Sequence, residues 1–251
     1  MYEPNVARVL AMLSPSDIVV DIGGWACPFN RADYIIDAEP FERRGYYATF
    51  GGKASQGGAE EHFTRDRWIV RDLCDRAPYP FADKSVDFVI CSHTLEDVRD
   101  PMWICAEMVR IAKRGYIEVP SRVWETCRGH ESPRTVGLSH HRWLVEIEGT
   151  RIDFLMKYHL IHSDWRYSLP ASFGASLGEA EAVQWLYWDD GFTWRERTIH
   201  GLDAQRAELA GYVERVRAYP PWRHAAGAMA DGVSRLSRGA RRYAKKVFPV
   251  R

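Results

Sequence analysis

The fold of this chain follows from one stretch near its start, Asp17-Ile18-Val19-Val20-Asp21-Ile22-Gly23-Gly24. The run is short, nearly continuous in apolar β-branched residues, and closed by two glycines. Such a run is typical of a strand that is buried on both faces of a parallel sheet. The glycines predict a tight turn at the carboxyl end of this strand.

Four further runs of the same kind follow and predict four more strands, at Tyr34–Asp37, Trp68–Asp72, Val86–Cys91 and Tyr116–Pro120. Between the last two, residues 100–115 predict a helix. Asp100 is its acidic cap, Pro101 its first residue and Gly115 its end. Only twelve residues separate Asp21 from Tyr34, so the first crossover holds at most a turn or two of helix. The pattern predicts an α/β fold with a mostly parallel central sheet and helices on both faces.

Beyond Pro120 the pattern changes, and residues 121–141 show no periodicity. Two hairpins are predicted, 143–147 with 152–156 and 183–188 with 192–198, and then a helix over 202–219. We therefore expect one domain over residues 1–200, with a cofactor half at 17–120 and acceptor-side insertions at 121–200. Residues 201–251 are expected to form a helical segment with a basic tail.

Composition excludes several classes of protein. The 251 residues contain 34 basic and 34 acidic side chains and 46% hydrophobic residues, which argues against a uniformly basic nucleic-acid binder and against disorder. The five cysteines form no C-x-x-C pair and are expected to be reduced thiols of a cytoplasmic protein. We expect no signal peptide and no membrane span. Residues 222–251 contain eight basic residues and a single acidic residue, Asp231. They are expected to form a solvated helix or, alternatively, to contact an anionic membrane surface.

The glycine turn after the first strand indicates a nucleotide-like ligand, because ligands of open α/β sheets bind at the carboxyl ends of the strands. A pyrophosphate is disfavoured. The positions after Gly23 lack the second and third glycines of a dinucleotide fingerprint, and no Gly-Lys-Ser/Thr of a P-loop occurs.

An ordered series of motifs instead resembles the class I S-adenosylmethionine-dependent methyltransferases, including those of the type 11 family. The series comprises Val20-Asp21-Ile22-Gly23-Gly24, Asp37, Arg71-Asp72-Leu73, residues 80–98 (PFADKSVDFVICSHTLEDV) and residues 110–120. The resemblance covers about residues 17–120. It implies a Rossmann-like fold and S-adenosyl-L-methionine as the cofactor.

The resemblance also implies a set of cofactor-binding residues. In the family the first acid and its glycines lie by the amino-acid part of the cofactor, the second acid accepts the ribose hydroxyls, and the third acid with its neighbour meets the adenine. The residues implied are Asp21, Gly23, Gly24, Trp25, Asp37, Asp72, Leu73, Ser92 and His93. Trp25 departs from the glycine-rich pattern, and it either stacks on the cofactor, closes the site or packs in the core.

Methyl transfer to a hydroxyl requires a general base, typically His or a carboxylate. The candidates at strand ends and in the loop before the first hairpin are His141, His140, His93, Glu96 and Glu118. We prefer His141 and then His140; the alternative is a pair of capping or surface histidines. Glu118 is alternatively a buried ion-pair partner of Arg122 or Arg71. No metal site is expected, because Asp189-Asp190 fits a hairpin turn and no local His/Asp spacing indicates ligands.

The acceptor is expected to be a carbohydrate or another polyhydroxylated metabolite. The Asn/Asp-Pro-Pro-Tyr motif of many N-methyltransferases is absent at Cys91-Ser92-His93-Thr94, and several aromatic residues beyond residue 120 could stack on sugar rings. These residues are Trp124, Trp143, Trp165, Trp185, Tyr187, Trp188 and Trp194. Alternatively they form a hydrophobic core or a homodimer interface. The hypothesis is a sugar O-methyltransferase; the alternatives are a methyltransferase of another small molecule and a non-catalytic module that binds a cofactor or partner.

Overall fold

The computed structural model of the chain describes residues 1–217, which form two compact units. The first unit consists of Met1–Arg122, His140–Met156 and Val183–Thr198. The second consists of Val123–Ser139, Lys157–Ala182 and the described residues from Ile199 onward. The predicted basic tail lies outside the described residues.

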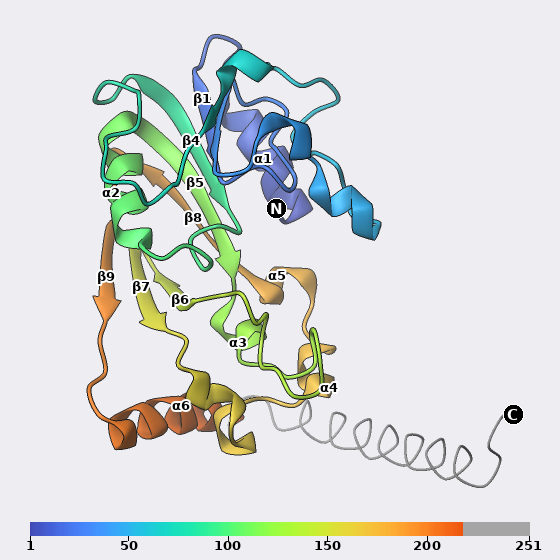
Figure 1. Ribbon diagram of the computed structural model, residues 1–251, viewed down its shortest axis with the longest axis vertical. Helices are drawn as coiled ribbons and strands as arrows, with labels where there is room; N and C mark the ends of the chain where they lie inside the picture. Colours follow the sequence, from blue (N-terminus) through green and yellow to red (C-terminus); the bar gives the residue numbers. More distant parts are fainter. Residues whose placement is uncertain (218–251) are drawn as a thin grey trace, which may run out of the picture. The chain divides into compact units, whose positions relative to one another are not determined.

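A six-stranded sheet forms the centre of the first unit (Figure 1). Its strands are β1 (Val19–Ile22), β2 (Tyr34–Asp37), β3 (Trp68–Val70), β4 (Val86–Ser92), β5 (Ala112–Pro120) and β8 (Val183–Asp189), in the order β3-β2-β1-β4-β5-β8. The first five are parallel, and β8 pairs antiparallel with β5. All five strands expected from the sequence are present.

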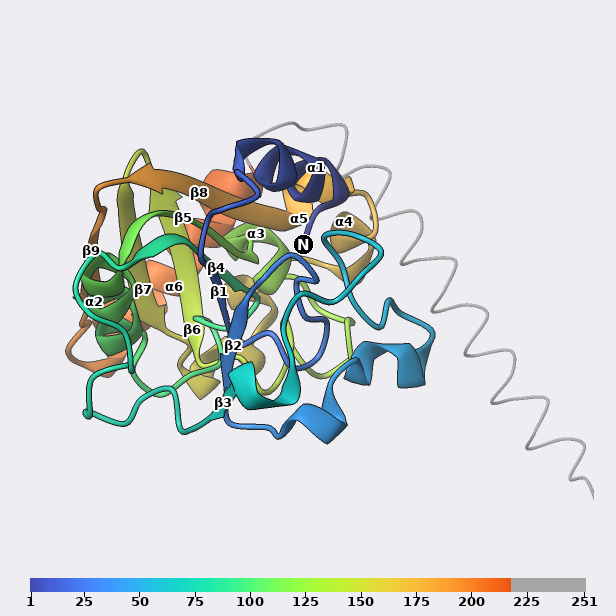
Figure 2. The same ribbon diagram turned by 90° about the horizontal axis from the view of Figure 1, so that it is seen from above.

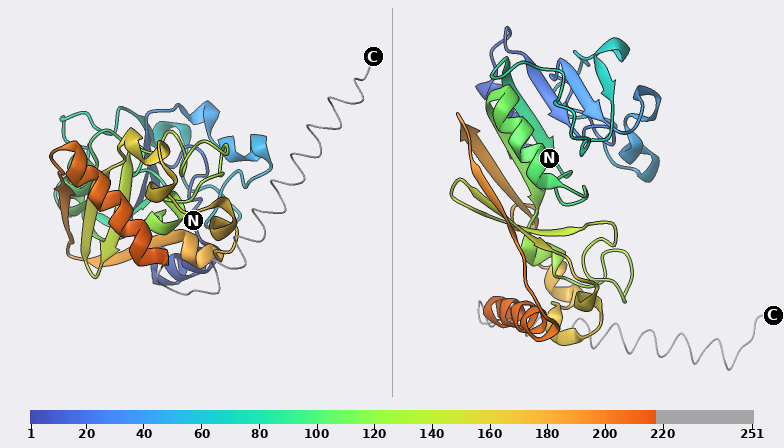
Figure 3. Two further views of the ribbon diagram at one scale, coloured as in Figure 1. Left: turned by 90° about the horizontal axis from the view of Figure 1, so that it is seen from below. Right: turned by 60° about the vertical axis from the view of Figure 1, so that its left-hand side comes forward.

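The alternation of side chains along the strands builds two separate cores. Val20 and Val89 point to the face that packs on α2 (Pro101–Ile111), whereas Val19 and Phe88 point to the face that packs on α1 (Glu3–Met12). Figure 2 shows the two helices on opposite sides of the sheet, and the right panel of Figure 3 shows α2 lying along one of them. The predicted α/β fold with helices on both faces is confirmed.

The connections between β1 and β4 contain no α-helix. The segment between β2 and β3 holds only the 3-10 turns η1 (Phe41–Arg43), η2 (Tyr46–Phe50) and η3 (Arg65–Arg67). The helix predicted over residues 100–115 is shorter than expected, because β5 begins at Ala112. Gly115 belongs to that strand; an added Cβ would lie 2.5 Å from the Val89 carbonyl oxygen, so the close approach to β4 requires glycine there.

The first predicted hairpin is confirmed and the second is wrong. β6 (Trp143–Glu148) and β7 (Arg151–Met156) pair antiparallel around the Gly149-Thr150 turn. β8 instead joins the six-stranded sheet, while β9 (Thr193–Arg197) pairs parallel with β7. The chain changes sheet at Asp190, which has a φ of 63°. The turn lies where the sequence predicts it. However, β8 pairs with the free edge of β5 and β9 pairs with the free edge of β7, so the two strands do not pair with each other.

The second unit is small and mainly helical. It contains most of α3 (Arg122–Glu125), the 3-10 turns η4 (His159–His162) and η5 (Trp165–Tyr167), and the helices α4 (Ala171–Gly174), α5 (Glu179–Ala182) and α6 (Leu202–Arg217). Cys127, Leu169, Phe173 and Val213 form its core. Within residues 1–217, no helix combines the length and apolar character needed to cross a membrane.

Candidate active site

The turn after β1 is shaped around the Asp21 carboxylate. Asp21 Oδ2 accepts a hydrogen bond from the Phe29 amide at 2.9 Å, so the chain folds back over the strand end. A Cβ on Gly24 would lie 2.2 Å from this oxygen, and a Cβ on Gly23, whose φ is +80°, would lie 2.1 Å from Thr94 Oγ1. Both glycines are therefore required sterically, which gives a physical reason for the Gly-Gly pair.

Asp37 ends β2 beside this turn. Its Oδ2 accepts the Trp25 amide at 3.1 Å and its Oδ1 accepts the Glu39 amide at 2.9 Å. The Trp25 ring stacks on Tyr46 of η2 with centroids 4.8 Å apart, and it packs at the edge of the core beneath α1. Trp25 therefore forms part of the wall of the turn, together with the segment 45–47.

Asp21 and Asp37 form a buried acidic pair with no compensating side chain. The residues are 3% and 4% exposed, and no Lys, Arg or His of residues 1–217 forms an ion pair with either carboxylate. Burial raises the pKa of Asp21 to about 7 and that of Asp37 to about 6. Strongly raised carboxyl pKa values at adjacent strand ends are typical of ligand sites. The pair suits a ligand that offers positive charge and hydroxyl groups.

The other predicted adenine-side residues are arranged differently. Asp72 lies at the surface, where its carboxylate pairs with Arg99, and this hydrogen bond lowers its pKa. Leu73 is buried in the core on the α2 face. A cavity of about 710 Å³ next to them is lined by Arg76, Arg99 and other residues, but by neither acid of the buried pair. Asp72 could meet a ligand only with Arg99 beside it.

The partly exposed His93, directly after β4, forms an ion pair with the buried Glu118 of β5. His93 Nε2 lies 3.1 Å from Glu118 Oε1, and its Nδ1 lies 3.6 Å from Glu96 Oε1. Burial opposes the charged form, but the hydrogen bond to Glu118 and the nearby Glu96 carboxylate raise the pKa of His93 to about 9. Although burial opposes ionisation of Glu118, the bond from His93 lowers its pKa to about 2. A protonated imidazole is a poor proton acceptor, so the geometry favours the ion-pair role for both residues.

The expected partners of Glu118 need correction. Arg122 pairs with Glu146, and Arg71 donates to the carbonyls of Ala77 and Pro78 instead. Glu118 faces the amino-terminal segment, where it accepts the Tyr2 amide at 2.8 Å and the Asn5 amide group at 3.2 Å. The sequence indicated that a carboxylate in a central strand must be paired; it could not indicate that α1 and β4 supply the partners.

Two further polar groups lie at the end of β4. Ser92 Oγ is buried and accepts or donates no hydrogen bond within the described part of the chain. The carboxylate oxygens of Glu96 are also buried and make no hydrogen bond by the same criterion, although His93 lies nearby. His93 itself adopts a φ of 53°, in the left-handed region that bulky side chains rarely occupy. Such backbone strain is concentrated at functional sites.

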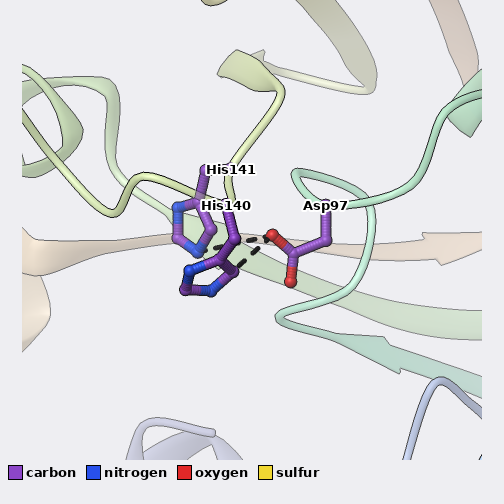
Figure 4. A group of neighbouring side chains, drawn as sticks. All are labelled: Asp97, His140 and His141. Carbon is purple, nitrogen blue, oxygen red and sulfur yellow. Dashed lines mark ion pairs between the residues drawn. The ribbon is translucent and has the colours of Figure 1, made fainter.

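His140 and His141 converge on Asp97, which follows the same strand end (Figure 4). Asp97 Oδ1 lies 3.6 Å from His141 Nε2 and 3.9 Å from His140 Nε2. The His141 side chain is buried, whereas that of His140 is 60% exposed. Both histidines are candidates from the sequence, whereas Asp97 is not. No local signal could have found it, because the contact joins segments more than 40 residues apart.

The aromatic residues beyond residue 120 do not gather on one surface. Within the first unit, Trp185 and Tyr187 lie on the α1 face of β8, while Trp188 lies on its other face in the core. Trp124 stacks on His130 in the second unit. The core explanation therefore accounts for most of the group.

A comparison with family models gives a partial match. The model of a methyltransferase domain family matches residues 41–117, which carry β3, β4, α2 and most of β5. A curated relative from Mycobacterium marinum, described as an uncharacterized methyltransferase, is 33% identical over 114 residues. The match covers 45% of this chain and 39% of that relative.

A search of solved structures found chains described as S-adenosylmethionine-dependent methyltransferases. An S-adenosylmethionine-dependent methyltransferase from Methanosarcina mazei is 16% identical, with a TM-score of 0.35 over 56% of this chain and 85% of the other. One from Aquifex aeolicus is 19% identical, with a TM-score of 0.31 over 51% and 70%. The central segment of this chain is thus similar in sequence to methyltransferase domains.

Proposed function

We propose that the chain is an S-adenosylmethionine-dependent methyltransferase. The observation that carries this proposal is the buried pair Asp21 and Asp37 around the Gly23-Gly24 turn, within a chain whose next segment matches a methyltransferase domain. S-adenosylmethionine supplies a methyl group on a positively charged sulfur, together with an ammonium and a ribose diol. The two carboxylates would hold these cationic and hydroxyl groups, and Gly24 leaves the space that the Asp21 carboxylate needs.

We further propose that the acceptor is a hydroxyl, as in a carbohydrate or polyhydroxylated metabolite. A hydroxyl is a poor nucleophile at neutral pH and must lose its proton during the transfer. His141 is the preferred base, because it is buried and its Nε2 faces the Asp97 carboxylate at 3.6 Å. A carboxylate beside an imidazole fixes its orientation and stabilises the imidazolium that forms.

Each part of the site has one proposed role. The turn after β1 and the end of β2 bind and orient the methyl donor, and His141 receives the acceptor proton. The in-line displacement then depends mainly on alignment and on exclusion of water. His93 remains protonated between its two carboxylates and offsets part of their negative charge.

Two measurements test the proposal. Calorimetry with S-adenosylhomocysteine should show micromolar binding; millimolar or absent binding would instead indicate a module without methyltransferase activity. Labelled S-adenosylmethionine should then transfer its methyl group to at least one member of a panel of saccharides and hydroxylated metabolites. No transfer to any of them, with the cofactor bound, would reject the hydroxyl acceptor.

The base is tested separately with His141→Gln. This variant should bind S-adenosylhomocysteine within about threefold of the wild type, while its turnover falls by about 10²-fold or more. His159→Gln, in the second unit, is the matched control and should retain turnover. Unchanged turnover of His141→Gln would remove this residue from the mechanism.

A further inference from the structure

We propose that Asp97, His140 and His141 form a binding site for a divalent transition-metal ion of the zinc type. The inference does not depend on methyltransferase activity. It rests on three ligand atoms, one from each residue, that all lie within 4.8 Å of one another (Figure 4).

The distances are close to those of a bound ion. A tetrahedral zinc ion with bonds of about 2.0–2.1 Å holds its ligand atoms about 3.3 Å apart. The Asp97 oxygen lies 3.6 Å and 3.9 Å from the two imidazole nitrogens. Binding an ion requires the three ligand atoms, which lie within 4.8 Å of one another, to draw together, and the exposed His140 side chain can rotate toward the ion.

The backbone fixes the two segments that carry these ligands. The carbonyl oxygen of Glu96 accepts the amides of Arg142 at 2.7 Å and Trp143 at 3.1 Å. Trp143 Nε1 also donates to the Val98 carbonyl at 2.8 Å, and its ring is buried in the core. Asp97 is thus flanked on both sides by residues bonded to the chain immediately after the histidine pair, which makes the site preorganised.

The ligand types select the class of ion. Two imidazoles and one carboxylate suit zinc, iron, cobalt or nickel, whereas magnesium and calcium prefer oxygen ligands alone. Three protein ligands also leave a coordination position for water, which is the arrangement of open zinc sites. The exposed His140 places this position within reach of solvent.

Occupancy by a metal has a consequence for the proposed base. A neutral imidazole has a single in-plane nitrogen lone pair. In the proposed base this lone pair is on Nδ1, because Nε2 faces Asp97, whereas a metal ion held at Nε2 requires the tautomer that is protonated at Nδ1. Metal binding and proton abstraction by His141 therefore exclude each other. Saturating zinc is expected to inhibit a reaction that uses this base.

The test measures binding without cofactor or acceptor, so its result is separate from that of the proposed methyl transfer. Tag-free full-length chain, treated with a chelator and dialysed, is titrated with Zn²⁺ by calorimetry and with Co²⁺ by visible absorption. One ion per chain is expected, with a cobalt spectrum typical of four- or five-coordination.

Variants assign the site. Asp97→Asn and the exposed His140→Ala should each weaken Zn²⁺ binding by at least about tenfold. His159→Ala is the matched control, because His159 and His162 form a second histidine pair with no carboxylate shown between them. This control should bind as the wild type does, and circular dichroism should show that every variant is folded.

Three outcomes would overturn the inference. The wild type would bind Zn²⁺ no more tightly than the Asp97→Asn, His140→Ala double variant, or binding would be lost in His159→Ala instead. A cobalt spectrum typical of six oxygen ligands would exclude the histidines as ligands.

Discussion

Two buried acidic groups of the first unit have opposite electrostatic environments. Glu118 is fully buried and has a pKa of about 2, whereas Asp21 and Asp37 are nearly as buried and have pKa values of about 7 and about 6. Burial disfavours the charged form in all three cases. The difference is the counter-charge, because His93 lies 3.1 Å from Glu118 while the aspartates have no such partner among residues 1–217.

This contrast separates structural acids from acids that are available to a ligand. Glu118 is satisfied by His93 and by donors of the amino-terminal segment, so it stabilises the folded chain by itself. Within residues 1–217, the aspartates accept hydrogen bonds from backbone amides and form no ion pair with a basic side chain, and a cationic ligand would favour their ionised form. Substitutions that neutralise Glu118 or the aspartates test this difference.

The largest expected effect is on stability, from Glu118→Gln. The substitution removes the negative charge that pairs with His93, and it places an amide group next to the N–H donors of the amino-terminal segment. The free energy of unfolding should therefore fall by roughly 3 kcal/mol. Urea denaturation measures the change. Glu148→Gln, at an exposed pair with Arg151, is the control and should change stability by less than about 1 kcal/mol. Equal effects of the two variants would contradict the structural role of Glu118.

Asp37→Asn should act on ligand binding instead. An asparagine keeps one acceptor for a backbone amide but loses the charge and the second acceptor, so affinity for S-adenosylhomocysteine should fall by about 30-fold, or about 2 kcal/mol. Calorimetry gives the dissociation constant. Asp66→Asn, on the surface before β3, should bind normally. Normal binding by Asp37→Asn would remove this acid from the cofactor site.

Gly24→Ala tests whether the turn needs glycine next to the Asp21 carboxylate. The added methyl group would lie 2.2 Å from Asp21 Oδ2, so the carboxylate must move and affinity for S-adenosylhomocysteine should fall by about tenfold. In Gly211→Ala, on helix α6, the new methyl group would lie 3.5 Å from the end of the Arg215 side chain, which is an ordinary contact. That variant should be slightly more stable than the wild type, by up to about 1 kcal/mol. If Gly24→Ala binds as well as the wild type, the turn does not hold the cofactor.

The smallest expected effect is the pH dependence of binding. The folded chain keeps Asp21 and Asp37 protonated up to about pH 7 and about pH 6, whereas both ionise near 3.8 when unfolded. Between about pH 4 and pH 7 the folded state binds more protons, so the free energy of unfolding without ligand falls as the pH rises. A cationic ligand favours the ionised acids, so affinity for S-adenosylmethionine should rise by about a fewfold across pH 5.5–7.5, with proton release.

Calorimetry in two buffers of different ionisation enthalpy measures this proton release. Asp37→Asn should release fewer protons than the wild type. Proton uptake on binding, or an affinity that falls over this pH range, would show that the aspartates do not face the positive charge.

Local patterns were sufficient for the five parallel strands of the central sheet and for the glycine turn after β1. Continuous β-branched runs such as Val19–Ile22 can be satisfied only by burial on both faces, so they predict parallel strands wherever they occur. The Gly23-Gly24 pair and the acid Asp37 were also recognisable, because turn chemistry and strand ends are encoded within a few residues. The local pattern failed at Gly115 and at β8 and β9, where neighbouring strands chose the conformation.

The sequence by itself therefore determined the fold class and the strand-end acids, since both depend on short-range periodicity and turn chemistry. Only the tertiary structure decided which of these groups are paired. It placed His93 against Glu118, whereas Asp21 and Asp37 form no ion pair with a basic side chain in the described residues 1–217. It also brought Asp97 to His140 and His141. These contacts depend on how distant segments pack, and charge, pKa and metal affinity follow from distances that no local pattern contains.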